Sequence, residues 1–130
     1  MKILVGYEES RVAEAALKLA LKHARAFGAD LFIVTSLEQS RELQKDDIEL
    51  VEDKLEDLKR TYKIDDLHCE TYAMVSLLSP GENLVEFCKD NDIDQIFIGV
   101  KKRSKVNKLV FGSNAQYIIL EAPCAVVTVK

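Results

Sequence analysis

The sequence has no tryptophan, only two prolines and two histidines, and no apolar run close to the length of a membrane-spanning helix. Because a bilayer span needs about 20 consecutive apolar residues, we expect no integral membrane protein. The opening residues, MKILVGYEES, reach two acids by position 9, too early for the apolar centre of a signal peptide. These absences predict a cytoplasmic protein that does not bind to a membrane.

Cysteine and histidine are too few and too scattered for a disulfide framework or a metal centre. Cys69, Cys88 and Cys124 form no CxxC pair, and each lies among apolar residues. An odd number of cysteines without a secretory signal argues against disulfides, so we expect three structural thiols. His23 and His68 have no partner at metal-ligand spacing, and we expect both on the surface and no metal site.

The balance of charge excludes a general nucleic-acid binder. The net charge is −4, whereas phosphate backbones are bound by clustered Lys and Arg. Residues 101–108 (KKRSKVNK) nevertheless hold five basic side chains and no acid, so the rest of the chain carries −9. A cationic segment on an acidic body can attract one small anion or an acidic protein partner.

What the chain does contain is a regular alternation of short apolar runs and amphipathic stretches. Its 130 residues have room for one domain, 1–130, without a linker or an internal repeat. We expect five strands, at 2–7, 29–36, 67–75, 95–100 and 124–129. We expect helices at 11–27, 39–62, 80–90 and 113–121. This alternation predicts a doubly wound α/β fold, a five-stranded parallel sheet with helices on both faces.

One place after the fourth expected strand combines several features of an anion site. In open α/β sheets, ligands bind beyond the carboxyl ends of the strands, where the strand order reverses. The fourth strand ends near Gly99, the basic segment follows, and Gly112 precedes a helix whose free N–H groups can bind phosphate. Ser113 and Asn114 can donate further hydrogen bonds. The alternative is a solvated basic loop before a capped helix.

The sequence also resembles the universal stress proteins over nearly its whole length, from KILVGYEESRVAEAAL through GADLFIVTS and SPGENLVEFCKDNDIDQIFIGV to LVFGSNAQYIILEAPCAVVTVK. Members of that family that bind ATP carry Gly, two residues, a second Gly, nine residues, then Gly and Ser or Thr. Here Gly99, residues 103–111, Gly112 and Ser113 match in register, and Lys102 replaces the second Gly. An Ala-Pro-Cys tripeptide before an apolar strand is also typical.

The resemblance implies a Rossmann-like fold related to the adenine nucleotide alpha hydrolases, with a site for ATP or another adenine nucleotide, with or without Mg²⁺. It also implies a homodimer formed through the C-terminal strand. The residues expected to contact phosphate or ribose are Gly99, Lys102, Gly112, Ser113 and Asn114. Those expected beside the ribose and base are Tyr7, Glu8, Thr35 and Ser36.

The function that we expect is nucleotide binding by a signalling or stress-response module. No residue has the position of a general base for an attacking water, so we expect no catalytic residue and at most slow ATP hydrolysis. An alternative is a dimeric interaction protein without a nucleotide, in which Lys102 and Glu9 mark a degenerate site and the basic segment binds an unknown acidic partner. A third class is a hydrolase or phosphotransferase that turns over Mg-ATP.

Glu9 bears on the choice between these functions, because it would repel a triphosphate if it pointed inward and would join the first helical turn if it pointed outward.

The residues that define two other α/β classes are absent from this sequence. A receiver domain would use the acidic pair Glu8-Glu9 but needs an Asp after the third strand, where residues 73–76 read AMVS. The G-x-S-x-G motif of the α/β hydrolases is absent.

Overall fold

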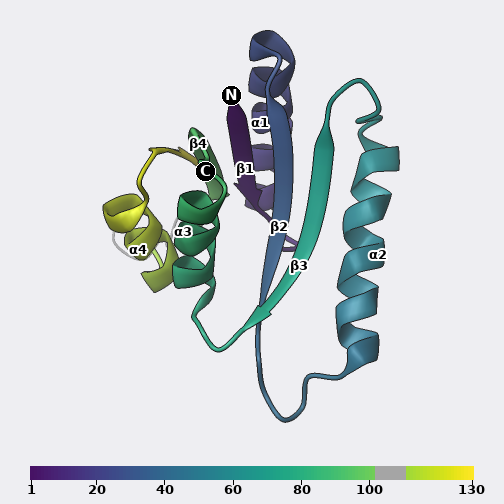
Figure 1. Ribbon diagram of the computed structural model, residues 1–130, viewed down its shortest axis with the longest axis vertical. Helices are drawn as coiled ribbons and strands as arrows, with labels where there is room; N and C mark the ends of the chain where they lie inside the picture. The colour runs from purple at the N-terminus through teal and green to yellow at the C-terminus, as the bar shows by residue number, and fades with distance from the viewer. Residues whose placement is uncertain (102–110) are drawn as a thin grey trace.

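The computed structural model shows a five-stranded, all-parallel sheet with helices on both faces, and it describes residues 1–101 and 111–130 (Figure 1). The strand order is β3-β2-β1-β4-β5, so the doubly wound fold is confirmed and the last strand lies at an edge of the sheet. The strands are β1 (Lys2–Gly6), β2 (Asp30–Glu38), β3 (Cys69–Ser76), β4 (Gln95–Gly99) and β5 (Ala125–Val129). The helices are α1 (Arg11–Phe27), α2 (Lys45–Thr61), α3 (Pro80–Asp90) and α4 (Ser113–Glu121).

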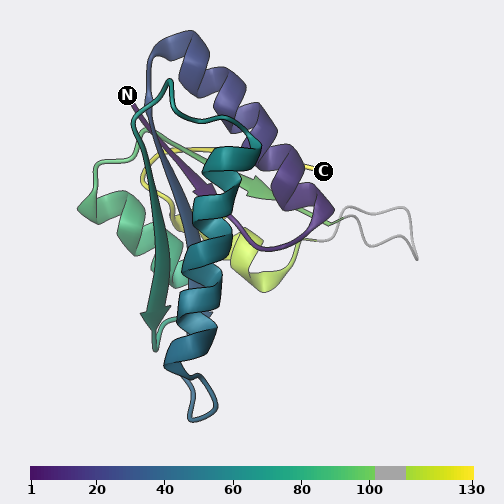
Figure 2. The same cartoon turned by 90° about the vertical axis from the view of Figure 1, so that its right-hand side faces the viewer.

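Alternate residues of the central strands face opposite helix layers, as the pleat of a strand requires. Ile3 and Val5 of β1 face a core that includes Leu17 of α1 and Leu55 of α2. Leu4 faces the second core, which α3 and α4 complete. Figure 2 looks onto the α1 and α2 side of the molecule. Because both faces are covered, the three central residues of β1 and of β4 are all apolar and buried rather than alternating.

Strands β2 and β3 continue past the end of β1. Gly6, the last residue of β1, is opposite Val34 of β2, and β2 then pairs with β3 as far as Glu38 and Ser76. The two strands therefore form a ledge at the carboxyl side of the sheet, visible in Figure 1 below β1. Thr35 and Ser36 lie on this ledge.

The helix expected at 39–62 is shorter than its apolar spacing suggests. Helix α2 begins at Lys45, because the backbone N–H of Gln44 donates to the Asp47 carboxylate over 2.9 Å, an arrangement that starts a helix. Residues 39–44 connect the ledge to the helix instead of forming its first turns.

His23 departs from the expectation that both histidines lie on the surface, because it is half-buried on α1. The ring lies edge-on to Phe97, with 5.0 Å between ring centroids, and its Nδ1 atom is buried with no partner among the described residues. Residue 23 follows the buried Ala20 by three positions, so it shares that flank of α1. His68 is exposed, as expected, with its Nε2 atom 3.0 Å from Glu70.

The three cysteines are free, and Cys88 is buried whereas the other two are half-buried. Burial raises the pKa of Cys69 to about 11 and that of Cys88 to about 12, so both remain neutral thiols at neutral pH. They act as small apolar side chains, as expected. Among the described residues, no helix is both long and apolar enough to cross a bilayer.

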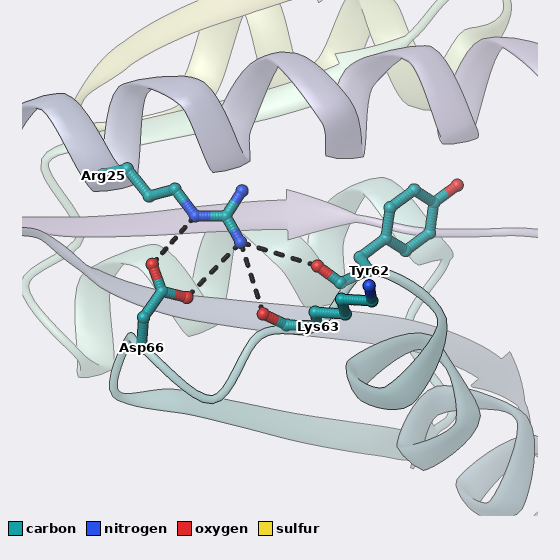
Figure 3. A network of polar contacts seen from close by, with 4 residues as sticks. All are labelled: Arg25, Tyr62, Lys63 and Asp66. Atoms are coloured by element: carbon teal, nitrogen blue, oxygen red, sulfur yellow. Dashed lines mark hydrogen bonds and ion pairs between the residues drawn. The ribbon is translucent and has the colours of Figure 1, made fainter.

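Arg25 ties the end of α1 to the end of α2 (Figure 3). Its guanidinium donates to both carboxylate oxygens of Asp66, over 3.0 and 3.3 Å, and reaches the carbonyl oxygens of Tyr62 and Lys63 at 3.5 Å. Those carbonyls lie just after the last turn of α2, where a cation is favourable.

This contact predicts a measurable change in the titration of one carboxyl group. The hydrogen bond from Arg25 lowers the pKa of Asp66 from its usual 3.8. The pair therefore stabilises the fold above the unfolded pKa, and this contribution is lost as the pH falls through the lower, folded pKa. In an Arg25→Met variant, we expect the NMR titration midpoint of Asp66 to return to its usual value. A Lys22→Met variant, which removes a cation from the same helix, should leave the midpoint low; if both variants moved it equally, general charge and not this contact would be the cause.

Candidate functional site

A cavity of about 430 Å³ lies at the carboxyl ends of β1 and β4. These two strands are neighbours, and the chain leaves them toward opposite edges of the sheet, so the cavity is at the topological switch point. Its volume falls within the range of about 300 to 1,000 Å³ that small-molecule sites occupy.

Eight of the nine residues expected at the site line this cavity, and Lys102 lies outside the described residues. They come from the ends of β1 and β4, from the ledge of β2 and from the start of α4. They are Tyr7, Glu8, Thr35, Ser36, Gly99, Gly112, Ser113 and Asn114.

Other parts of the cavity wall were missed by sequence reasoning. Ala13 of α1, Ile118 of α4, and Pro80 and Leu84 of α3 also line it, and Lys101 lies at its edge after β4. The apolar spacing of these helices places such residues in a core but does not show that they border a cavity. The start of α3 lies at this end of the sheet because it follows β3, but only the strand order brings it beside the cavity.

The first residues of α4 line the cavity. Gly112 is the residue before the helix, with φ −65° and ψ 165°, and among the described residues no side chain caps the first turn. A Cβ atom at Gly112 would meet no other described residue within 4 Å. The free N–H groups at this end carry roughly half a positive charge, which favours a phosphate or carboxylate.

Asn114 has one of its two polar atoms already engaged. Its Oδ1 atom accepts a hydrogen bond from the backbone N–H of Gly81 at 3.0 Å. A Cβ atom at Gly81 would lie 3.0 Å from the Asn114 carbonyl oxygen, so the first turns of α3 and α4 are in direct contact. Asn114 therefore holds α4 against α3, and among the described residues its amide N–H groups donate to no protein acceptor.

Gly99 has a packing reason to be glycine that is independent of any ligand. A Cβ atom there would lie 2.5 Å from the Val12 carbonyl carbon and 2.7 Å from the Ala13 nitrogen. The end of β4 thus passes against the backbone of the first turn of α1, which no side chain permits. This close approach brings α1 up to the cavity.

The ends of β1 and β2 are joined by polar contacts beside the cavity. Thr35 donates its hydroxyl to the Tyr7 carbonyl oxygen at 2.8 Å, and the Tyr7 N–H donates to Val34 at 2.9 Å. The Tyr7 ring packs against the core on the α1 and α2 side. Burial there, with the Glu14 carboxylate nearby, raises the pKa of Tyr7. Thr35 is therefore a structural tie as well as a wall residue.

The two acids after β1 have separate positions. Glu8 is exposed and lines the cavity, and it is the only carboxylate among the described lining residues. Glu9 does not line it; its carboxylate lies 2.9 Å from the Lys54 ammonium of α2. Since α1 begins at Arg11 after the Ser10 cap, Glu9 neither enters the site nor joins the first turn.

These features define a doubly wound α/β domain with an uncapped helix N-terminus at its switch-point cavity. The chain belongs to the universal stress protein family, because the sequence profile of that family matches residues 1–130. The resemblance seen in its motifs is thereby confirmed.

Individual relatives agree with this assignment over nearly their full lengths. A solved universal stress protein from Archaeoglobus fulgidus is 29% identical, with a TM-score of 0.84 and coverage of 99% of this chain and 97% of that one. A structure of the universal stress protein from Archaeoglobus fulgidus in complex with dAMP is 25% identical, with a TM-score of 0.80 and coverage of 99% and 96%. The universal stress protein in the QAH/OAS sulfhydrylase 3′ region of Thermus aquaticus is 27% identical over 137 residues, covering 98% of this chain and 97% of that protein.

Proposed function

We propose that this protein binds an adenine nucleotide in the switch-point cavity. The observation that carries the proposal is the convergence of four elements on one cavity: the start of α4, the ends of β1 and β4, and the ledge of β2. The relative from Archaeoglobus fulgidus that was solved in complex with dAMP supports an adenine nucleotide as the ligand.

In this proposal the phosphates bind the N–H groups at Gly112 and Ser113, with Lys101 as a nearby cation. The base extends toward Thr35 and Ser36, and Glu8 is placed to accept hydrogen bonds from ribose hydroxyls. ATP would bring Mg²⁺ on its own phosphates, because Mg²⁺ is commonly held by phosphates with few protein ligands. Lys102, outside the described residues, remains a candidate from the sequence alone.

The protein acts in this account as a nucleotide-responsive signalling or stress module, with residues 1–130 as its single domain. Glu8 is exposed, and no histidine is among the described lining residues, so a strong general base for water is lacking there. Any ATP hydrolysis would be slow. A bound nucleotide would instead favour one conformation of the protein, or its binding to one partner. The size of this shift is set by the difference in nucleotide affinity between the two conformations.

Calorimetry on protein stripped of ligand tests this proposal. We expect AMP and ATP, with and without Mg²⁺, to bind once per chain with micromolar affinity, and denaturation of freshly purified protein to release an adenine nucleotide. GMP, with the same phosphate and ribose, is the matched control and should bind at least tenfold more weakly, a difference of about 1.4 kcal/mol. Absence of any heat with both adenine nucleotides would contradict the proposal.

A homodimer through β5 is the second candidate, and it also fits an interaction protein without a nucleotide. Strand β5 lies at the sheet edge, pairs only with β4 among the described strands, and is mostly apolar. Such an edge is prone to pair with another strand. Leu120 of the neighbouring α4 is 79% exposed. Sedimentation at micromolar concentrations should show a dimer with or without nucleotide; monomer alone would remove this candidate.

A further inference from the structure

A buried amide on α3 is bonded to a hydroxyl in the cavity wall. Asn83 is 4% exposed and is the only polar side chain in the buried class among the described residues. Its Nδ2 atom donates to Ser36 Oγ at 2.8 Å. Burying an amide is costly unless it is hydrogen-bonded, so this bond fixes both side chains. Ser36 itself is half-buried and lines the cavity.

The direction of this hydrogen bond determines what Ser36 can offer to a ligand. A serine hydroxyl has one O–H donor and two acceptor lone pairs. The Asn83 amide occupies one lone pair, and among the described residues the Ser36 hydroxyl donates to no protein acceptor. The hydroxyl proton is therefore free for a group inside the cavity.

On this basis, and resting on the nucleotide-binding function proposed above, we propose that Ser36 is a specificity residue that donates its hydroxyl proton to a ring nitrogen of the adenine. Asn83 is the positioning residue that directs this proton. The ring nitrogens N1, N3 and N7 of the adenine are acceptors, whereas its exocyclic amine is a donor that cannot accept this proton. Ser36 meets the base and not the phosphate, because it lies on the ledge of β2 while the free N–H groups belong to α4.

The first turn of α3 also fixes how far the base wall lies from the phosphate end. Asn83 in this turn bonds Ser36 on β2, and the Gly81 N–H bonds Asn114 on α4. Ser79 and Glu82 close a capping box that makes the turn regular. The same short segment thus joins both ends of the cavity before any ligand enters, which reduces the cost of ordering the site on binding.

The test is a double-mutant cycle in which one change removes a hydroxyl from the protein and the other replaces a single atom or group of the ligand. Binding affinities are measured by calorimetry on the full chain. The variants are Ser36→Ala and, as a control outside the cavity, Ser76→Ala, whose hydroxyl accepts from the Leu78 N–H. The ligands are AMP, its 1-deaza, 3-deaza and 7-deaza analogues, and purine riboside 5′-monophosphate, which lacks the amine.

We expect Ser36→Ala to weaken AMP binding about 3- to 10-fold, the usual net effect of one hydrogen bond. One of the three deaza analogues should bind the wild type more weakly than AMP does, by the same factor. That analogue should bind Ser36→Ala as tightly as AMP binds Ser36→Ala. Ser76→Ala should bind every ligand as the wild type does. The proposal is overturned if Ser36→Ala binds AMP as tightly as the wild type, or if all deaza losses persist unchanged in the variant. It is also overturned if purine riboside 5′-monophosphate, and no deaza analogue, shows the loss of affinity that disappears in Ser36→Ala. Ser36 would then accept a hydrogen bond from the amine and not donate one.

Asn83→Leu separates positioning from mere packing. Without the amide, the Ser36 hydroxyl can turn, so the loss caused by the critical deaza substitution should shrink below its wild-type value while AMP still binds. A purely structural role would lower stability and leave that loss intact. If the wild type did not bind AMP, the proposed function itself would be contradicted. That outcome is distinct from a wild type that binds AMP without any contribution from Ser36.

Discussion

Replacing Gly99 by alanine is expected to destabilise the protein by about 3 kcal/mol, the upper end of the usual cost of overpacking. The new Cβ atom would overlap the Val12 carbonyl group and the Ala13 nitrogen, with the nearest atom at 2.5 Å. Both neighbours are backbone, so no side-chain rotation can relieve the overlap. Either β4 or the first turn of α1 must move, and both border the cavity. Urea unfolding of the variant measures this loss as a lower midpoint.

Gly112→Ala is the matched control, because it adds the same methyl group to the other glycine of the motif. Its Cβ atom would meet no other described residue within 4 Å, and the φ of −65° suits any residue. We expect a cost below about 1 kcal/mol, the difference between glycine and alanine before a helix. Equal midpoints for the two variants would show that Gly99 is not held by this packing.

Gly112→Asp should lower the affinity for AMP without lowering the stability of the fold. An aspartate before the first helical turn is a favoured cap, so the fold should be unchanged or gain about 0.5 kcal/mol. The carboxylate would occupy the N–H groups proposed for phosphate and repel it. Two like charges about 4 Å apart near a surface cost about 4 kcal/mol, so the affinity for AMP should fall at least about 100-fold.

The neutral variant Gly112→Asn has nearly the same shape and also caps a helix well. It should weaken AMP binding far less, because it lacks the charge. Calorimetry on the two variants, at the same ionic strength, compares them directly. If Asp and Asn at this position bound AMP equally well, the phosphate would not lie at the start of α4.

Much of the fold could be predicted because short-range chemistry marks the ends of its elements. Ser10 accepts from the Ala13 N–H at 3.2 Å to start α1, and Gly28 ends it with φ 63°. Ser79 and Glu82 form a capping box that starts α3. The predicted start of α2, at residue 39, was wrong. The apolar spacing begins before residue 45, but the contact between Gln44 and Asp47 starts the helix at Lys45.

The position of the site was predictable for a similar reason, since the carboxyl ends of parallel strands share one edge. Residues after β1 and β4 and at the start of α4 do converge there. The contribution of α3 was not predictable, because it depends on the strand order. Asn83, between Glu82 and Leu84, looks like any polar residue of an amphipathic helix until its contact with Ser36 is known. The tight packing at Gly99 likewise exists only between elements distant in sequence.

The central claim, that an adenine nucleotide occupies the switch-point cavity, is tested most directly by following backbone amide resonances during a titration with AMP. The account predicts that Ser36, Gly99, Gly112 and Ser113 shift together and saturate at one nucleotide per chain. A second hollow at the end of α2, lined by the cations Lys59, Arg60 and Lys63 and also by Asp65, offers a competing place for an anion. Shifts confined to that hollow, or no shifts at all, would contradict the account.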